Sequence, residues 1–178
     1  MAIEVEMKFK IDSITDIEYQ LVEKEAKLQK IVQQKDHYFN HPLRDFAKTD
    51  EAFRIRESAN NIILTYKGPK IDRESKTRKE YNLELSDLNI AQEILLSLGF
   101  KPVAIVSKER KIYLWKDITI CLDFIETLGS FLEAELVVPS EKEYPEAKTK
   151  IKKHLEQLGI EIQKTIRKSY LELLLNNK

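Results

Sequence analysis

Charged residues alternate with apolar residues along the predicted strands, and this pattern constrains the fold more than any other feature. In the segment Ile3 to Ile11 every second residue is apolar, and the residues between them include Glu4, Glu6 and Lys8. Successive side chains of a β-strand point to opposite faces, so these charged residues share one face. A half-exposed sheet normally shows mixed polar groups to water, whereas this face carries charges alone.

The same arrangement recurs in four later segments that are predicted to be strands. Each contains two like charges two or four positions apart, which therefore lie on the same face. The opposite face of these segments is apolar enough to be covered by amphipathic helices. The pairs are Arg54 and Arg56, Glu80 and Glu84, Lys108 and Arg110, and Glu133 and Glu135.

If helices cover the apolar face, the charged face is expected to line the interior of a closed sheet. Closure also removes the exposed sheet edges. An unpaired buried charge costs on the order of several kcal/mol, so a bound group must balance these charges. Carboxylates bind hard divalent cations, whereas several Arg and Lys side chains converge on a multiply charged oxyanion. The pattern therefore favours a site for a metal ion together with a phosphate chain.

The remaining periodicities predict roughly eight strands and four helices in one α+β domain that spans residues 1–178. Ser13 is expected to cap a helix of about four to five turns, because apolar residues follow at helical spacing, namely Ile17, Leu21, Leu28 and Ile31. The other expected helices run from Leu88 to Leu98, from Pro145 to Leu158 and from Ser169 to Leu175.

Turn residues separate the expected strands. Asn60-Asn61 predicts a tight hairpin, whereas Gly68-Pro69 is expected to end a strand and begin a mobile polar loop from Lys70 to Lys76. The strands expected after the first are Asp36–Phe39, Ala52–Arg56, Ile62–Lys67, Lys79–Leu85, Val106–Tyr113, Ile118–Phe124 and Phe131–Val138.

Composition argues against several classes of function. The 178 residues include 30 Lys and Arg and 30 Asp and Glu, so the formal net charge is zero and no nucleic-acid partner is expected. The single cysteine, Cys121, argues against a disulfide or a cysteine-cluster metal site and fits a reducing compartment. The chain contains no apolar run of 18 residues and does not begin like a signal peptide, so no membrane partner and a cytoplasmic location are expected.

The strand motifs together resemble those of the CYTH superfamily, the triphosphate tunnel metalloenzymes. Glu4-Val5-Glu6-Met7-Lys8 is similar to the ExExK signature of this family, and the likeness extends along the chain to Lys168-Ser169-Tyr170. The chain looks most similar to the class IV adenylyl cyclase-like members of bacteria and archaea. The resemblance implies a closed eight-stranded antiparallel β-barrel, the triphosphate tunnel, with helices packed outside.

The resemblance also implies roles for the charged residues, and it implies Mg²⁺ or Mn²⁺ as the cofactor. Asp123 would be a further acid near the metal or the attacking oxygen. Glu4, Glu6, Lys8 and Asp123 are thus the expected catalytic residues. The expected metal ligands are Glu4, Glu6, Glu133 and Glu135. The expected triphosphate ligands are Lys8, Arg54, Arg56, Lys67, Lys108, Arg110 and Lys168.

Some assignments stay open at this point. The mid-chain acid of the family is matched by Glu80 or by Glu84, and the basic residue near the end is matched by Arg167 or by Lys168. Where related phosphatases have an Arg before the second strand, this chain reads Lys35-Asp36-His37-Tyr38, so that contact is not carried over. The ligand set also omits His37 and His41, because hard metals prefer carboxylates.

The resemblance permits two reactions inside the barrel. We expect divalent-metal-dependent hydrolysis of inorganic tripolyphosphate or of an organic triphosphate. The first alternative is a class IV adenylyl cyclase that converts ATP to cyclic AMP and pyrophosphate. Hydrolysis ranks above it because cyclization requires a base pocket, and no sequence feature establishes one. The second alternative is a non-catalytic sensor of triphosphate or polyphosphate, although anion capture alone would not require the carboxylates. The expected partner is a small-molecule triphosphate, and a homodimer is left open.

Overall fold

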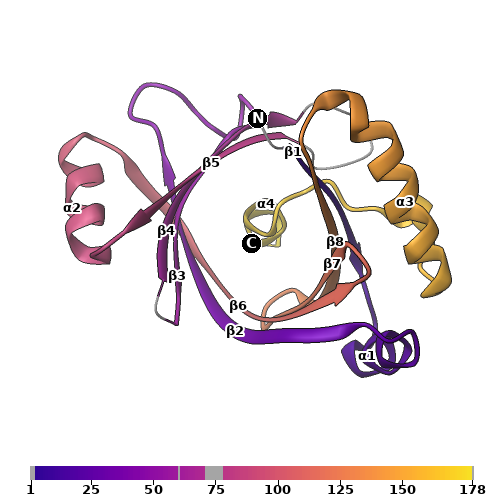
Figure 1. The fold of residues 1–178 in the computed structure, drawn as a ribbon. Helices are drawn as coiled ribbons and strands as arrows, with labels where there is room; N and C mark the ends of the chain where they lie inside the picture. The colour runs from indigo at the N-terminus through magenta and orange to yellow at the C-terminus, as the bar shows by residue number, and fades with distance from the viewer. Residues whose placement is uncertain (1–2, 60, 71–77, 178) are drawn as a thin grey trace.

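The computed structural model describes residues 3–59, 61–70 and 78–177, and within these ranges eight strands close into an antiparallel barrel (Figure 1). The order around the barrel is β1-β5-β4-β3-β2-β6-β7-β8. The expected closed eight-stranded barrel is therefore confirmed. The strands are β1 (Ile3–Lys10), β2 (Lys27–Asn40), β3 (Ala52–Ser58), β4 (Asn61–Lys70), β5 (Arg78–Leu85), β6 (Lys101–Trp115), β7 (Ile118–Ile125) and β8 (Gly129–Val138).

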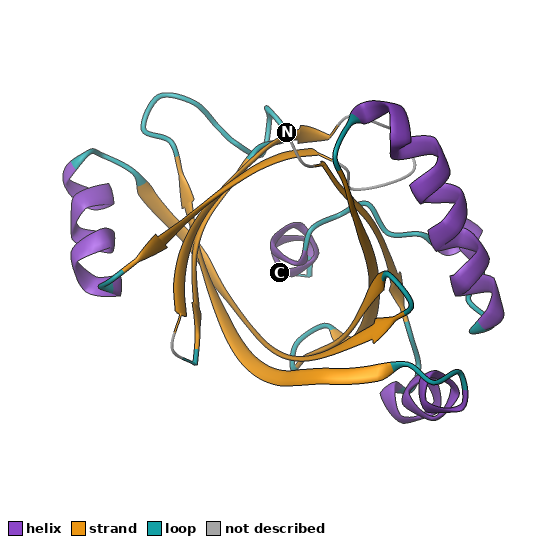
Figure 2. Cartoon of the chain, in the orientation of Figure 1, coloured by secondary structure: helices purple, strands orange, loops and turns teal. Residues whose placement is uncertain are grey.

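The largest hydrophobic core lies between the outer face of the barrel and two helices, α1 (Ile14–Glu23) and α3 (Tyr144–Gln157), which Figure 2 shows on the outside of the barrel. Val5 and Met7 of β1 pack there with Ile151 of α3, and all three side chains are fully buried. Burying a side chain of this size contributes about 2 kcal/mol. The apolar faces of the strands thus pack against the helices, and the charged faces line the interior of the barrel.

Helix α2 (Leu88–Ser97) covers another part of the outer face and packs Leu95 against Ile55 of β3. Its N-cap is Asp87, whose carboxylate accepts a hydrogen bond of 2.9 Å from the backbone N–H of Ile90. The helix ends before Gly99, which has a φ of +85°, a conformation that favours glycine. Local capping therefore sets both ends of this helix, which the sequence predicted over Leu88 to Leu98.

Helix α4 (Tyr170–Asn176) is placed differently from the other three, because it lies in line with the barrel axis at the centre of the view in Figure 1. Ser169 caps it in a reciprocal capping box with Glu172. Tyr170 packs with Val106 and Phe131 in a small core at the end of the barrel where β7 turns into β8. One end of the tunnel is thus covered by the C-terminal helix.

The prediction of a long helix after Ser13 was wrong in its extent. The Ser13 hydroxyl does accept a hydrogen bond from the backbone N–H of Asp16 at 3.2 Å, but α1 ends at Glu23. The chain then reverses through Glu25, which has a φ of +58°, and β2 begins at Lys27. Leu28 lies on β2 and is half-exposed, because pairing with the distant β6 outweighs the local helical spacing.

The expectation that Gly68-Pro69 ends a strand was also wrong, since β4 continues to Lys70. A register shift between β4 and β5 spans Lys67 to Lys70, where the missing N–H of proline is tolerated. The expected mobile loop falls almost entirely on residues 71–77, which lie outside the described residues, as does Asn60 of the expected hairpin. Ser58 and Asn61 are paired, so this connection is as short as predicted.

Two 3₁₀ helices complete the described elements, at Glu141–Glu143 and Ile162–Lys164. None of the described helices has the length and hydropathy that a membrane-spanning helix needs.

Candidate functional site

The inner faces of the strands line a cavity of about 90 Å³, called the tunnel below. Its described lining holds both signs of charge in nearly equal numbers, which the strand faces predicted. Tyr38, Ala52, Ser169 and Tyr170 complete the lining. The charged lining residues are Arg54, Arg56, Lys67, Arg78, Lys108 and Arg110, together with Glu4, Glu6, Glu80, Glu133 and Glu135.

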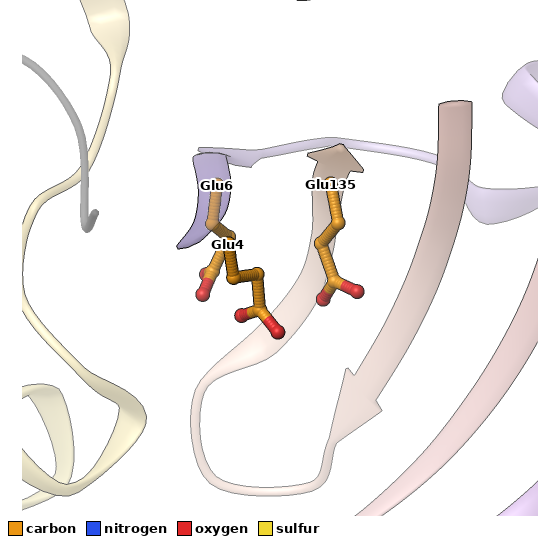
Figure 3. Close-up of side chains that lie close together, drawn as sticks. All are labelled: Glu4, Glu6 and Glu135. Atoms are coloured by element: carbon orange, nitrogen blue, oxygen red, sulfur yellow. The ribbon is translucent and has the colours of Figure 1, made fainter. Parts of the chain in front are cut away.

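Three carboxylates gather at one place on the tunnel wall. Glu4 and Glu6 come from β1, and Glu135 lies directly opposite Glu6 on the neighbouring β8. One oxygen from each lies within 4.8 Å of the others, and Figure 3 shows the three side chains reaching the same way. We call these three residues the carboxylate cluster. Hard oxygen donors at this separation suit a divalent cation such as Mg²⁺ or Mn²⁺.

The electrostatics of the carboxylate cluster also fit a cation. Burial and the neighbouring charge of Glu4 raise the pKa of Glu135 to about 8. Burial likewise raises the pKa of Glu4, and the repulsion of Glu80 and Glu6 adds to this effect although Lys67 opposes it. A cation bound among these carboxylates would favour their ionised forms.

Glu133 is separate from the carboxylate cluster, although it was expected to be a metal ligand. It lies opposite Lys8 in the strand register, and its carboxylate is 3.9 Å from the Lys8 ammonium. It also accepts a hydrogen bond from Arg110. The structure thus places Glu133 among the cations, two residues along β8 from Glu135.

Two buried aspartates hold the cations of the tunnel wall in pairs. Asp36 accepts hydrogen bonds from Arg56 Nε at 2.6 Å, from Arg56 Nη2 at 2.8 Å and from Arg54 Nη1 at 3.1 Å. Burial raises the pKa of Asp36, but the charges of Arg54 and Arg56 outweigh it and hold the pKa well below its usual value. Bidentate pairs of this kind fix the guanidinium planes before any ligand arrives.

Asp123 holds the second pair of cations. It accepts hydrogen bonds from Arg110 Nε and Nη2, both at 2.6 Å, and from Lys108 Nζ at 3.3 Å. Asp123 was expected near the metal or the attacking oxygen, but it is fully buried and outside the tunnel lining. Its contacts make it a residue that positions Lys108 and Arg110.

Two lysines of the expected triphosphate ligands lie against the ring of Tyr170, but of the two the described tunnel lining includes Lys108 and not Lys8. Lys8 is fully buried, and its ammonium lies 3.9 Å from the centre of the Tyr170 ring. Lys108 lies 4.9 Å from the same ring. Burial and the charge of Arg110 lower the pKa of Lys108 to about 8. Tyr170 thus contacts two of the expected ligands from one end of the tunnel.

The structure places Glu80 and Glu84 differently but does not distinguish Arg167 from Lys168. Glu80 lines the tunnel and accepts a contact of 2.5 Å from Lys67, whereas Glu84 is exposed. Lys168 and Arg167 are both exposed, and neither is among the tunnel-lining residues. The expected ligand role of Lys168 therefore has no support in the geometry.

Sequence reasoning missed two charged residues of the site. Arg78 is buried and lines the tunnel, and its guanidinium donates to the backbone carbonyl of Gly68 at 3.2 Å. It stands two residues before Glu80, so strand alternation could have identified it. Asp36 likewise shares a strand face with Tyr38, two residues on, but its strand was predicted too short to reveal that face.

Comparisons with known proteins agree with this architecture. The family model described as the CYTH domain matches residues 2–170. A Methanocaldococcus jannaschii protein, provisionally named an adenylate cyclase, is 43% identical over 171 residues, which cover 96% of this chain and 98% of that protein. A solved structure from Pyrococcus horikoshii OT3 is 44% identical with a TM-score of 0.91, and the match covers 98% of this chain and 99% of that chain.

A more distant structure has the same fold. It is a Hippeastrum protein for which a dominant triphosphatase activity is described, and it is 17% identical with a TM-score of 0.68. The match covers 100% of this chain and 97% of that chain. At this identity the likeness concerns the fold alone.

Proposed function

This chain belongs to the CYTH family, and from that premise we propose that it is a divalent-metal-dependent triphosphatase that hydrolyses inorganic tripolyphosphate or an organic triphosphate inside its barrel. Proteins of this family are divalent-metal-dependent enzymes that act as triphosphatases or adenylyl cyclases. One observation carries the proposal: the carboxylate cluster and five expected phosphate ligands line a single cavity. A metal and a phosphate chain would together satisfy both sets of charges.

Glu4, Glu6 and Glu135 would hold the metal ion. Their oxygen donors and the raised pKa values of Glu4 and Glu135 fit a hard divalent cation. When bound, such an ion supplies positive charge to phosphate oxygens and orients a water molecule for in-line attack.

The cations of the tunnel wall would grip the phosphate chain. Arg54, Arg56 and Arg110 are already fixed by buried aspartates, so little reorganisation is needed when the chain binds. Their charge would make the attacked phosphorus more electrophilic and offset the charge of the leaving pyrophosphate. Catalysis would thus consist of positioning and electrostatic stabilisation.

A covalent intermediate on the protein is not part of the proposal. Cys121 is the single cysteine, and its thiol is buried 3.9 Å from a carboxylate oxygen of Glu135. Burial raises the pKa of this thiol well above its usual value. A protonated thiol is a poor nucleophile, so attack by water is the simpler path.

The second candidate function is adenylyl cyclase, which the name of the Methanocaldococcus relative favours. The same cations would hold ATP, but the ribose 3′-hydroxyl would attack the α-phosphorus and pyrophosphate would leave. The two reactions differ in what must be bound, because cyclization requires the nucleoside in a bent conformation.

Product analysis tests the proposal. The protein is incubated with tripolyphosphate, thiamine triphosphate or ATP in the presence of Mg²⁺ or Mn²⁺, and phosphate, pyrophosphate and cyclic AMP are resolved. We expect hydrolysis, seen for tripolyphosphate as phosphate and pyrophosphate in equal amounts. Stoichiometric cyclic AMP and pyrophosphate from ATP, with tripolyphosphate inert, would instead establish the cyclase. Tight binding without turnover of any substrate would point to a sensor.

A further inference from the structure

Part of strand β5 has an edge without a partner strand. Residues 80–85 pair with β4 on one side, but on the other side the described residues pair β5 with β1 only at Arg78, which lies opposite Glu4. Figure 1 shows the end of β5 projecting from the barrel wall towards α2. We call the side of residues 79–87 that faces away from β4 the β5 edge. Its backbone N–H and C=O groups are a template for a further strand.

The outer face of β5 carries large apolar side chains that remain exposed. Tyr81 is 52% exposed and Leu83 is 60% exposed. They alternate with Glu80, which lines the tunnel, so both point to the outside of the barrel. The Tyr81 ring is stacked on the ring of Tyr66 of β4, with 6.3 Å between the centroids. Exposed apolar residues along a free edge favour pairing with a strand of another chain.

Helix α2 extends this apolar surface. Ile90 is 58% exposed and Ile94 is 54% exposed, and they lie one turn apart on one flank of the helix. Gln92 and Leu96, on the other flank, line a groove together with residues of β2 and β6. Because α2 packs on the barrel between these two flanks, Ile90 and Ile94 face the β5 side. The apolar flank of α2 and the β5 edge therefore lie next to each other.

A second free edge shows how this chain protects an unpaired strand. The first half of β2 pairs with β6, whereas the pairing of β2 with β3 begins only after it. This edge carries Lys27 and Lys30 beside Ile31, which is 53% exposed. Lysines on an edge are a common means of preventing strand addition. Residues 80–85 of β5 contain no lysine, so we expect another strand to cover the β5 edge.

The sequence of the β5 edge is complementary to itself. In an antiparallel pair of two β5 strands centred on Leu83, Tyr81 lies opposite Leu85 of the second copy and continues the apolar outer face. Lys79 then lies opposite Asp87, and both side chains are exposed. Asp87 has extended backbone, with a φ of −147° and a ψ of 122°, so it can take part in the pairing. Opposite charges at paired positions stabilise such a ladder.

Neighbouring registers are disfavoured by charge. A pair centred on Asn82 places Glu80 opposite Glu84, and a pair centred on Glu84 places that residue opposite its own copy. Like charges directly opposite each other destabilise an antiparallel pair. The register centred on Leu83 instead places Glu84 opposite the amide of Asn82. Charge complementarity thus selects one register, and its symmetry about Leu83 fits a second copy of the same chain.

We propose that a second copy of this chain pairs with the β5 edge, so that two barrels join through antiparallel β5 strands about a twofold axis at Leu83. The inference does not depend on the proposed function, because it concerns the outside of the barrel. It gives a specific interface to the homodimer that the sequence left open.

Sedimentation analysis tests the proposal. The unsubstituted protein should have the mass of two chains at micromolar concentration. Leu83→Lys places a charge at the centre of the pair and should raise the dissociation constant of the dimer roughly tenfold or more. Ile31→Lys is the matched control, because Ile31 is 53% exposed on the free edge of β2, and it should leave the constant unchanged. A monomer at all concentrations, or a dimer that Leu83→Lys leaves intact, would overturn the proposal.

Disulfide trapping tests the register and does not depend on the folding of Leu83→Lys. The single cysteine, Cys121, is buried, so Leu83→Cys adds one accessible thiol. The Cα atoms joined by a disulfide are about 4.4–6.8 Å apart, a range that directly opposite residues of an antiparallel pair satisfy. With oxidised glutathione, Leu83→Cys should give a disulfide-linked dimer and Ile31→Cys should not. Equal cross-linking of the two variants, or none in either, would contradict the proposed pairing.

Discussion

The charged residues of the tunnel wall form two groups: cations that buried aspartates hold in place, and carboxylates that repel one another. Arg56 and Arg110 each make a bidentate contact with a buried aspartate, so their positions are fixed in the empty protein. The carboxylate cluster is different, because its members repel one another and two of them have raised pKa values. Removing a charge from an aspartate–arginine pair should therefore lower the stability of the fold, whereas removing one from the carboxylate cluster should not.

Replacing Glu4 or Glu6 with Gln should lower turnover by orders of magnitude, because either change removes a proposed metal ligand. The melting temperature should stay the same or rise, since the substitution removes a negative charge from a crowded cluster. Turnover with Mg²⁺ and Mn²⁺ and thermal unfolding measure the two effects. Glu84→Gln, at an exposed position of the same sheet, is the control. Near-normal activity of both cluster variants would refute the metal assignment.

Metal affinity should depend on pH through Glu135. The pKa of about 8 means that this carboxyl holds a proton at neutral pH, and a metal ion must displace it. Apparent Mg²⁺ affinity should therefore rise between pH 6 and pH 8 and level off above that range. In the metal-free protein the same proton stabilises the fold fully below the unfolded pKa of about 4.5, and that contribution is lost as pH rises through 8. Calorimetry across this range should show the slope in the unsubstituted protein, whereas a flat profile would contradict it.

At the scale of the elements, strand alternation predicts which face a residue occupies but not how deep it lies in the barrel. Glu80 and Glu84 share a face of β5, yet only Glu80 lines the tunnel. Glu133 and Glu135 likewise lie about 7 Å apart along β8. This separation places Glu133 among cations and Glu135 in the carboxylate cluster. Depth is set by the register between strands, which a single sequence does not reveal.

Element ends were predictable where capping is local and unpredictable where pairing is distant. Helices were predicted from Leu88 and from Ser169, and these starts agree with the structure because the side chains of Asp87 and Ser169 each accept a hydrogen bond from a backbone N–H three residues ahead. The long β2 strand was missed over its first half, since its partner β6 lies far along the chain and its apolar spacing also fits a helix. The same reason hid Asp36 as a member of the site.

Helix α4 is expected to act on the tunnel through Tyr170, whose hydroxyl donates to Asp123 at 2.8 Å and whose ring lies against Lys8 and Lys108. Tyr170→Phe keeps the ring and should raise KM for tripolyphosphate by roughly tenfold with a smaller effect on kcat. Tyr170→Leu also removes the cation–π contacts and should lower kcat further. Steady-state kinetics measure both, and Tyr19→Phe at an exposed tyrosine is the control. Identical kinetics for the Phe and Leu variants would show that the ring has no such role.

At the scale of the whole molecule, the barrel confines many like charges at short range. The repulsion is seen at Lys108, because burial and the neighbouring charge of Arg110 lower its pKa to about 8. A polyanion that binds only the folded barrel relieves this repulsion and shifts the folding equilibrium by mass action. Stability should therefore report on occupancy of the tunnel.

Tripolyphosphate should raise the melting temperature in proportion to the logarithm of its concentration in the millimolar range. Arg56→Ala should reduce that rise, because it removes a cation that lines the tunnel. Lys79→Ala, at an exposed position on β5, should not reduce it. Differential scanning fluorimetry makes the comparison, and the absence of a shift with any triphosphate would contradict the tunnel as a binding site.

The pairing of the first strand with the last has a consequence for how the protein is made. Strand β1 pairs along its whole length with β8, from Ile3 opposite Val138 to Lys10 opposite Phe131. During synthesis, β1 is made before the other strands of the barrel and lacks this partner until all of them have been made. Contacts this distant in sequence form slowly. A nascent chain without β8 lacks Glu135 and one strand of the pair that carries the carboxylate cluster, so the tunnel can form only after β8 has been made.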